Sequence, residues 1–188
     1  MAIRVVVVAA AASVAIKVEP AMAFKVGDWV VHPQHGLGQV TRLETKQFGS
    51  GEAQKYYEIA LPKSTLWVPV ESPLIGLRPL TAKNDLSRYR GLLKGPPVPL
   101  SQDHHQRRGE LMGRLKPGTF LVKCEVVRDL TAQSWRKRLS EVEATLLRNT
   151  RDGLCQEWAV SEGVSVSDAT QEVETLLREA KQAYQPQP

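Results

Sequence analysis

The fold is decided by residues 26–40, whose sequence is VGDWVVHPQHGLGQV. Gly27 and Asp28 are a typical turn pair, and Trp29–His32 is a short run of β-prone residues. Pro33 follows this run and cannot donate to a sheet ladder, so the pattern predicts that a strand ends there.

Two glycines then favour a reversal of the chain. Gly36 and Gly38 can both adopt positive φ, which lets the chain turn back on itself. The next run, Gln39–Lys46, has apolar faces supplied by Val40 and Leu43. The pattern therefore predicts a strand, a tight loop and a second strand.

Two further runs extend this pattern. Residues Tyr56–Leu61 and Thr65–Val70 are β-prone, and turn residues at Gly49-Ser50-Gly51 and Pro62-Lys63-Ser64 divide the runs. Four or five short strands within about fifty residues indicate a small, strongly bent antiparallel barrel or sheet.

These motifs, in this order, resemble the CarD/CdnL family of bacterial transcription regulators. The segments that carry the resemblance are Val26-Gly27-Asp28-x-Val30-Val31-x-Pro33-x-x-Gly36-x-Gly38, Tyr56-Tyr57-x-Ile59, Val68-Pro69-Val70-Glu71, Gly76-Leu77-Arg78 and Glu125-Val126-Val127-Arg128-Asp129-Leu130. The resemblance covers residues 24–184. It implies a Tudor-like domain that interacts with RNA polymerase and is shared with the transcription-repair coupling factor, followed by a basic helical domain.

We therefore expect an α+β protein in two domains. The small antiparallel Tudor-like β domain would span residues 24–78, and the all-α helical DNA-binding domain would span residues 79–184. A linker at Glu71–Thr81 would join them, since Pro73, Gly76 and Pro79 break any regular period. Residues 185–188 would form a short tail.

Residues 1–23 do not belong to this pattern. Arg4 precedes an apolar run, and Ala21-Met22-Ala23 has the form of a signal-peptidase site, so a small exported protein is one interpretation. The run is too short to span a bilayer, and Lys17, Glu19 and Pro20 interrupt the approach to the site. We favour an over-extended start or a disordered tail, which would be dispensable, with Met22 as a natural starting point.

Composition and charge narrow the class of partner. Cys124 and Cys155 are too few for a disulfide framework, so we expect a reducing compartment. The resemblance implies a cytoplasmic protein that is associated with the nucleoid through RNA polymerase. Residues 24–78 hold six Lys and Arg against five Asp and Glu, whereas residues 83–158 hold fifteen against nine. A net charge of +6 in the second half favours nucleic acid as its partner, although a solvated helical surface would also carry it.

Apolar spacing predicts the helices. The first would be capped by Asn84 or Thr81 and stop at Gly95, before an extended connector over residues 95–99. Others would run over Gln102–Leu115, from Thr119 to Arg128 or Leu130, and from Trp135 to Arg148 or on through Trp158. The last, capped by Ser165 or Ser167, would have the inward stripe Val166, Ala169, Val173, Leu176, Leu177, Ala180 and Tyr184.

The chemical motifs of common enzyme classes are missing from the sequence. It contains no P-loop, GxGxxG, nucleophile elbow or HExxH. His32 and His35 could contribute to a metal site, but no third His or Cys lies near them in sequence. We therefore expect no enzyme activity, no cofactor and no metal.

The resemblance implies a transcription regulator. In the family, the β domain docks on the lobe of the RNA polymerase β subunit, and the helical domain stabilises the open complex at the upstream edge of the promoter bubble. We expect this chain to be a monomer that contacts promoter DNA, largely its backbone and minor-groove shape, and no membrane. The alternative is a polymerase- or protein-binding adaptor whose DNA function is weakened.

By alignment, the polymerase-contacting positions are Lys46 and Trp67, where the family has two basic residues. Trp67 could anchor an interface or belong to the core. The DNA-contacting positions are His105, Arg107 and Arg108. In the family a tryptophan wedges into the minor groove at the position of His105, and two basic residues that follow it contact the backbone.

Overall fold

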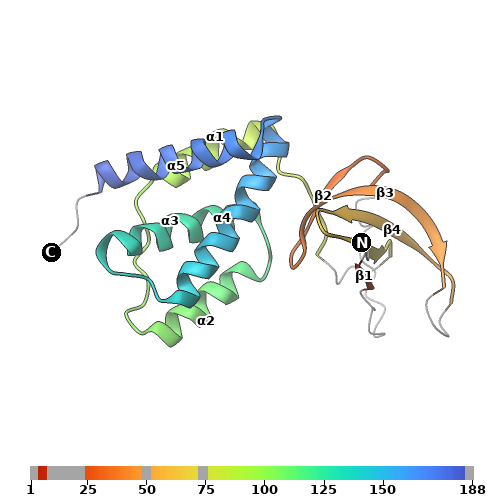
Figure 1. Cartoon of the computed structure of the whole chain (residues 1–188), viewed down its shortest axis with the longest axis horizontal. Helices are drawn as coiled ribbons and strands as arrows, with labels where there is room; N and C mark the ends of the chain where they lie inside the picture. The colour runs from red at the N-terminus through yellow and green to blue at the C-terminus, as the bar shows by residue number, and fades with distance from the viewer. Residues whose placement is uncertain (1–3, 8–23, 48–51, 72–75, 185–188) are drawn as a thin grey trace. The chain divides into compact units, whose positions relative to one another are not determined.

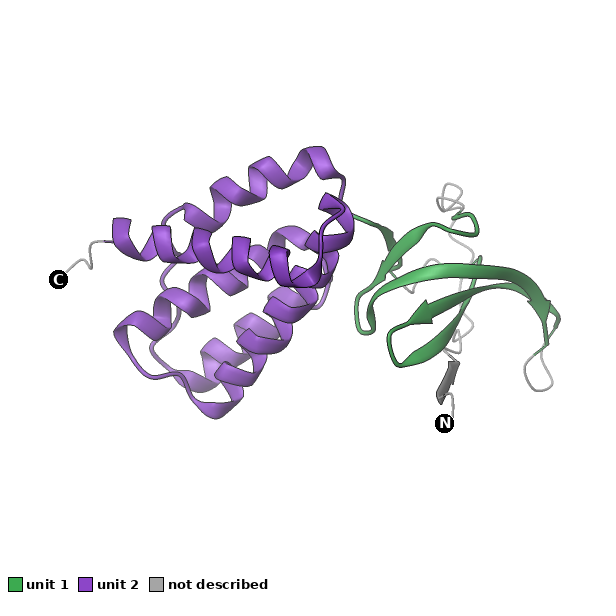
Figure 2. Ribbon diagram, turned by 45° about the horizontal axis from the view of Figure 1, so that its top comes forward, with its two compact units in different colours: residues 1–80 green, residues 81–188 purple. Residues whose placement is uncertain are grey.

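The computed structural model describes residues 4–7, 24–47, 52–71 and 76–184. The chain forms two compact units, residues 1–80 and residues 81–188 (Figure 2). We call them the β unit and the helical unit. The predicted fold class is confirmed: a Tudor-like sheet is followed by an all-α unit.

The β unit is one sheet with the strand order β1-β5-β4-β3-β2-β6. Its strands are β1 (Arg4–Val7), β2 (Trp29–His32), β3 (Gly36–Lys46), β4 (Gln54–Leu61), β5 (Ser64–Pro69) and β6 (Arg78–Pro79). Among the strands that the structure describes, only β1 pairs in parallel, with β5; the other pairs are antiparallel. The long β3 is irregular between Val40 and Arg42 and is visibly curved in Figure 1, as a bulge produces.

The sequence did not predict β1 and β6. Residues Arg4–Val7 pair with Ser64–Trp67, so part of the N-terminal extension forms an edge strand. Residues Arg78–Pro79 pair with β2 within the segment predicted to be a linker. The predicted turn at residues 49–51 and Pro73 of the linker lie outside the described residues, as do residues 8–23.

One face of the sheet forms a core. Because side chains alternate along a strand, Val40, Ile59 and Leu66 share that face, and they pack with Tyr57 and Val68. Leu43 was expected to be part of the apolar face of its strand. Its side chain is 49% exposed, because it lies beyond the bulge, near the end of β3.

The two glycines of the first loop have different roles. Gly36 adopts positive φ, +78°, as predicted. Gly27 also has positive φ, +97°. Gly38 is not at positive φ; a Cβ there would lie 2.5 Å from the Ile59 Cγ2 and 2.9 Å from the Ala60 carbonyl oxygen. The prediction of positive φ was wrong, because close approach of β4 is what requires this glycine.

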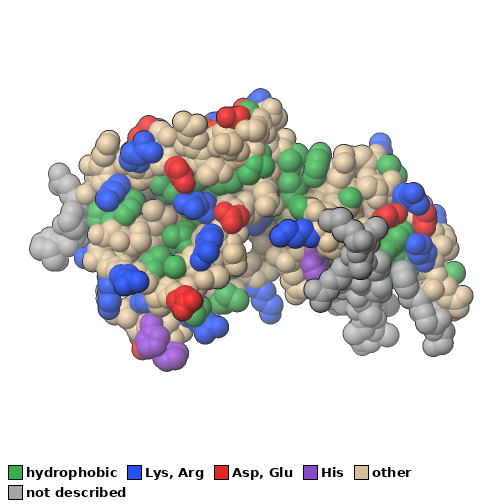
Figure 3. All heavy atoms as spheres, viewed as in Figure 1, with side chains coloured by type: hydrophobic (Ala, Val, Ile, Leu, Met, Phe, Trp, Pro, Cys, Tyr) green, Lys and Arg blue, Asp and Glu red, His purple; other side chains and the backbone are tan. Residues whose placement is uncertain are grey.

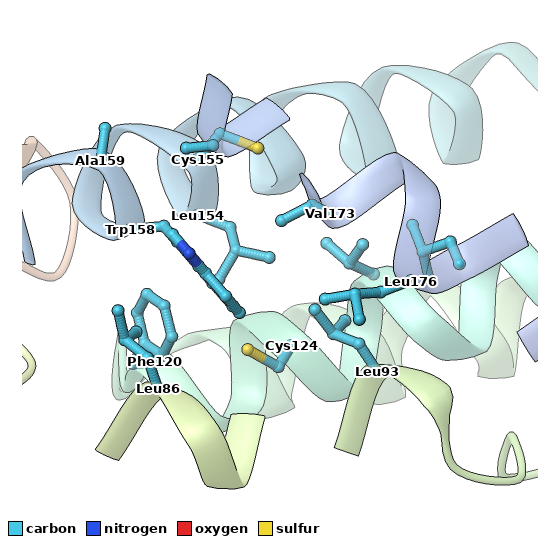
Figure 4. Packing of buried hydrophobic residues seen from close by; sticks show 13 residues of the cluster. Leu86, Leu93, Phe120, Cys124, Leu154, Cys155, Trp158, Ala159, Val173 and Leu176 are labelled. Atoms are coloured by element: carbon cyan, nitrogen blue, oxygen red, sulfur yellow. The ribbon is translucent and has the colours of Figure 1, made fainter. Parts of the chain in front are cut away.

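Between residues 81 and 184, the helical unit forms five α-helices: α1 (Leu86–Lys94), α2 (His104–Leu115), α3 (Phe120–Arg136), α4 (Glu141–Glu162) and α5 (Val166–Ala183). Trp158 is completely buried among them, with Phe120, Leu154 and Val173 (Figure 4). Its Nε1 donates to Glu172 Oε2 over 3.1 Å, which satisfies the one polar group of the indole. No helix among the described residues is long and apolar enough to cross a membrane.

The boundary between α3 and α4 differs from the prediction. Helix α3 continues past Leu130 because Asp129 is buried and paired with Arg114 and Arg128 instead of interrupting the helix. Trp135 therefore lies in the last turn of α3, where it packs on Tyr184 at 5.4 Å between ring centroids, and is only half-buried.

Caps explain the other boundaries. Ser165, one of the two predicted residues, caps α5 by accepting from Asp168 N, and Gly95 follows α1 as expected. Neither Asn84 nor Thr81 caps α1, which instead follows a 3₁₀ turn at Lys83–Asp85. The inward stripe of α5 is confirmed from Ala169 to Ala180, but Val166 is 50% exposed because it begins the helix.

Candidate functional site

The two candidate residues of the β unit are in contact. Lys46 ends β3 and Trp67 lies on β5, and the Lys46 Nζ is 3.3 Å from the centroid of the Trp67 ring. The same ammonium is 3.3 Å from Glu44 Oε2. A cation over an indole face is attracted by the ring quadrupole, so Trp67 holds the Lys46 ammonium in position.

Trp67 does not belong to the core cluster of the sheet. It pairs with Glu58, which pairs with Arg42, so these three side chains share the face opposite to Ile59 and Leu66. The indole is nevertheless only 7% exposed. Little of the indole is therefore open to a partner, although it lies outside the main core cluster.

The candidate residues of the helical unit begin α2. Asp103 caps this helix, since its Oδ1 accepts from Gln106 N over 2.7 Å, and that backbone hydrogen bond lowers the pKa of Asp103. His104 and His105 then occupy the first turn, with ring centroids 4.0 Å apart, and both are exposed. Figure 3 shows histidine side chains at the surface of the helical unit, with Lys and Arg side chains near them.

Arg107 and Arg108 do not act as a pair. The Arg107 guanidinium is buried: its Nε donates to Glu143 Oε1 over 2.6 Å, and its Nη1 donates to the Ser101 and Gln102 carbonyl oxygens. Arg108 is exposed. Of the two predicted backbone contacts, only Arg108 has a solvent-facing guanidinium, because Arg107 is used to hold α2 against α4.

Glu143 is the partner that the sequence interpretation missed. Its Oε2 accepts from the Ser140 backbone N over 2.9 Å and from the Ser140 hydroxyl over 2.8 Å. Burial opposes the charge of Glu143, but the bonds from Arg107 and Ser140 outweigh it and lower the pKa of this carboxyl. The spacing Ser140-x-x-Glu143 is a capping-box signal and could have identified the residue.

His32 and His35 are not arranged as metal ligands. The Nδ1 of His32 accepts from the backbone N of Gln34 and of His35, at 3.1 and 3.3 Å. Burial, with a smaller contribution from His35, lowers the pKa of His32 to about 4. Within the described part of the chain, no three His, Cys, Asp or Glu side chains are grouped for a metal ion.

Comparison with known proteins identifies the family. Residues 24–81 match the family model of the CarD-like/TRCF RID domain, and residues 90–174 match that of the CarD C-terminal domain. The chain belongs to the CarD-like family. The two models follow each other in the order that the β unit and the helical unit have here.

A curated relative of this CarD-like chain is the protein named "Putative transcription factor YdeB" of Bacillus subtilis (strain 168). The two are 29% identical over 145 residues, which cover 76% of this chain and 94% of the relative. The CarD-like family comprises transcription regulators with an RNA-polymerase-interacting domain and is not a family of enzymes.

Proposed function

We propose that this protein regulates transcription by binding the RNA polymerase β subunit with its β unit and promoter DNA with its helical unit. The DNA contact would lie at the upstream edge of the bubble and stabilise the open complex. The observation that carries the proposal is the match of residues 24–81 to the polymerase-interacting domain, followed in the same chain by the CarD C-terminal domain.

The polymerase surface would include Lys46 and Trp67. The near-neutral charge of residues 24–78 suits a protein partner better than DNA. The partly exposed Lys46 ammonium would be the charge-assisted donor of this surface, and the buried Trp67 indole would hold it in place.

The DNA surface would include His105 and Arg108. Both are exposed on the first two turns of α2, in the basic half of the chain. Arg108 would contact phosphate, and the His105 imidazole would stack or donate at the minor groove, where only shape and A·T content are read.

The alternative function is a polymerase-binding adaptor with weakened DNA contact. The burial of Arg107 favours it, because one of the two backbone-contacting guanidinium groups is directed into the protein. The two functions differ in whether the helical unit lengthens the life of the open complex.

The proposed binding of RNA polymerase is tested by reversing the charge of one residue. Lys46→Glu should weaken binding of the full chain to purified RNA polymerase, because it replaces the cation over Trp67 by an anion. Lys63→Glu, which makes the same charge change at the exposed β4–β5 turn, should bind as the wild type does. Equal affinity of the two variants would remove Lys46 from the polymerase surface.

The proposed stabilisation of the open complex is tested with the wild-type protein. Its addition should lengthen the lifetime of polymerase–promoter open complexes, measured after a competitor is added at one salt concentration. An unchanged lifetime together with normal polymerase binding would establish the adaptor function instead.

A further inference from the structure

Three consecutive basic residues follow the body of α3 and remain outside the proposed site. Arg136 ends the helix, and Lys137 and Arg138 continue into the turn before α4. All three side chains are exposed, and no ion pair described between side chains involves any of them. We call residues 136–138 the basic turn.

Of the basic turn, only Arg136 is placed to stabilise α3. A cation in the last turn of a helix interacts favourably with its dipole, but Arg136 alone supplies this charge, and the effect is limited to the last turn. Lys137 is already in extended conformation, with φ −150° and ψ 143°. Three clustered, unpaired cations repel one another, so they indicate a partner that carries negative charge.

The residues after the basic turn hold it beside the start of α2. Leu139 packs against the core cluster that contains Leu111 of α2, and Ser140 is joined to Glu143 by the capping box. Glu143 is in turn clasped by Arg107 of α2. In Figure 1 the start of α2, the end of α3 and the start of α4 lie at the same end of the helical unit.

The Arg107–Glu143 pair therefore links the basic start of α2 to the segment that follows the basic turn. His105 and Arg108 are exposed on α2, the helix that holds Arg107, and the basic turn precedes α4, the helix that holds Glu143. The exposed acids of these elements are Asp103, Glu110 and Glu141, and the exposed cations Arg108, Arg136, Lys137 and Arg138 outnumber them.

We propose that the basic turn, Arg136–Arg138, is a second phosphate-binding element for duplex DNA, and that Arg107 is a positioning residue that aligns it with Arg108. The inference rests on the proposed binding of promoter DNA and deepens it. Two separated groups of cations contact more phosphates than α2 alone, and each contact releases counterions. Arg107 itself contacts no DNA.

The basic turn is tested by the salt dependence of DNA binding by the full chain. With Arg136, Lys137 and Arg138 all changed to Ala, affinity for a promoter duplex should fall at least about tenfold, and the slope of log affinity against log salt should decrease by about 2 to 3. The control changes Arg88, Arg178 and Lys181 to Ala, which removes three exposed cations elsewhere in the helical unit. The control should keep the wild-type slope.

The role of Arg107 is tested by replacing the whole pair. Arg107→Met with Glu143→Met removes both charges from a buried site, a change that is often neutral for stability. The double variant should bind the promoter duplex about threefold more weakly at an unchanged slope, because the basic turn is no longer aligned with Arg108. Unchanged affinity would contradict the positioning role of Arg107. A slope lower by about 1 in this folded double variant would instead make Arg107 a phosphate contact.

The outcomes separate the two proposals. A wild-type protein that shows no salt-dependent binding to promoter DNA, alone or with polymerase, contradicts the proposed function. Wild-type binding that the basic-turn variant retains as fully as its control contradicts only the role of the basic turn.

Discussion

Gly38 shows how strongly a single residue constrains the β unit. A side chain at this position would meet the Ile59 methyl group, Leu61 and the Ala60 carbonyl oxygen, and the carbonyl belongs to the backbone of β4, which cannot move aside. Gly38→Ala should therefore lower the free energy of unfolding of the β unit by about 1 to 3 kcal/mol. Urea unfolding followed by circular dichroism measures this change.

The control for this prediction lies in α1. Gly91 is helical and has no atom within 4 Å of the position of its Cβ. Gly91→Ala should increase stability by about 0.5 to 1 kcal/mol, because alanine is the better helix former. Equal effects of the two substitutions would contradict the close-approach explanation of Gly38.

We expect His105 to lie where the family has a tryptophan. Indole offers more flat apolar area than imidazole, and stacking of a base on an aromatic side chain contributes about 1 to 3 kcal/mol. His105→Trp should lengthen the open-complex lifetime, and His105→Ala should shorten it modestly. The three proteins are compared on one promoter at one salt concentration, and identical lifetimes would remove His105 from the mechanism.

Residue type and spacing predicted that α2 has a basic start, but not which basic residues remain free. Arg107 and Arg108 are indistinguishable in sequence. The difference arises because Glu143, 36 residues later, comes within hydrogen-bonding distance of one of them. Tertiary contacts of this kind are set by how the helices pack, which local patterns do not contain.

At the scale of elements, the contact between α2 and α4 should depend on pH. Because the pKa of Glu143 is lowered in the folded protein, its contribution to stability is present above the ordinary Glu value of about 4.3 and is lost as pH falls through the folded value. Glu143→Gln should lower stability at pH 7 by about 3 to 5 kcal/mol, since it leaves Arg107 buried without a counter-charge.

Thermal unfolding of the two proteins between pH 3 and pH 7 checks this prediction. The stability difference between wild type and Glu143→Gln should narrow at the acid end. A difference that stays constant over the whole range would mean that the Glu143 charge does not stabilise the folded helical unit.

Strand β1 has a predictable effect on the sheet. It pairs with β5 at the end of the strand order, so removing it uncovers one edge and leaves the other strand pairs in place. A chain that starts at Met22 should therefore fold and should bind polymerase no less tightly than the full chain. Pull-down of RNA polymerase with both chains measures this, and recovery of native protein cut after Ala23 outside the cytoplasm would contradict the over-extended start.

Elements were predictable where the sequence pattern and the tertiary contacts agree. Strands β2 to β5 and the long apolar stripe of α5 follow from period and turn residues. The end of α3 did not, because the apolar spacing does not show that Asp129 is buried in the helix between Arg114 and Arg128. Strand β1 was missed because a parallel edge strand depends on a partner sixty residues away.

At the scale of the whole molecule, the two units have separate cores. The sheet core around Ile59 and the helical core around Trp158 share no residue. The change in charge balance along the sequence indicated this division, since the near-neutral and basic halves correspond to the β and helical units. The two units can therefore differ in stability and in the partner that stabilises them.

The two cysteines of the chain allow the opening of the helical unit to be measured separately from that of the β unit. Cys124 and Cys155 both lie in the helical core, and burial raises the pKa of both thiols. A maleimide can alkylate them only when that core opens, so the rate of alkylation reports opening of the helical unit alone. Promoter DNA should lower the alkylation rate by stabilising the closed form of the helical unit. A polymerase β-lobe fragment bound to the β unit should leave that rate unchanged.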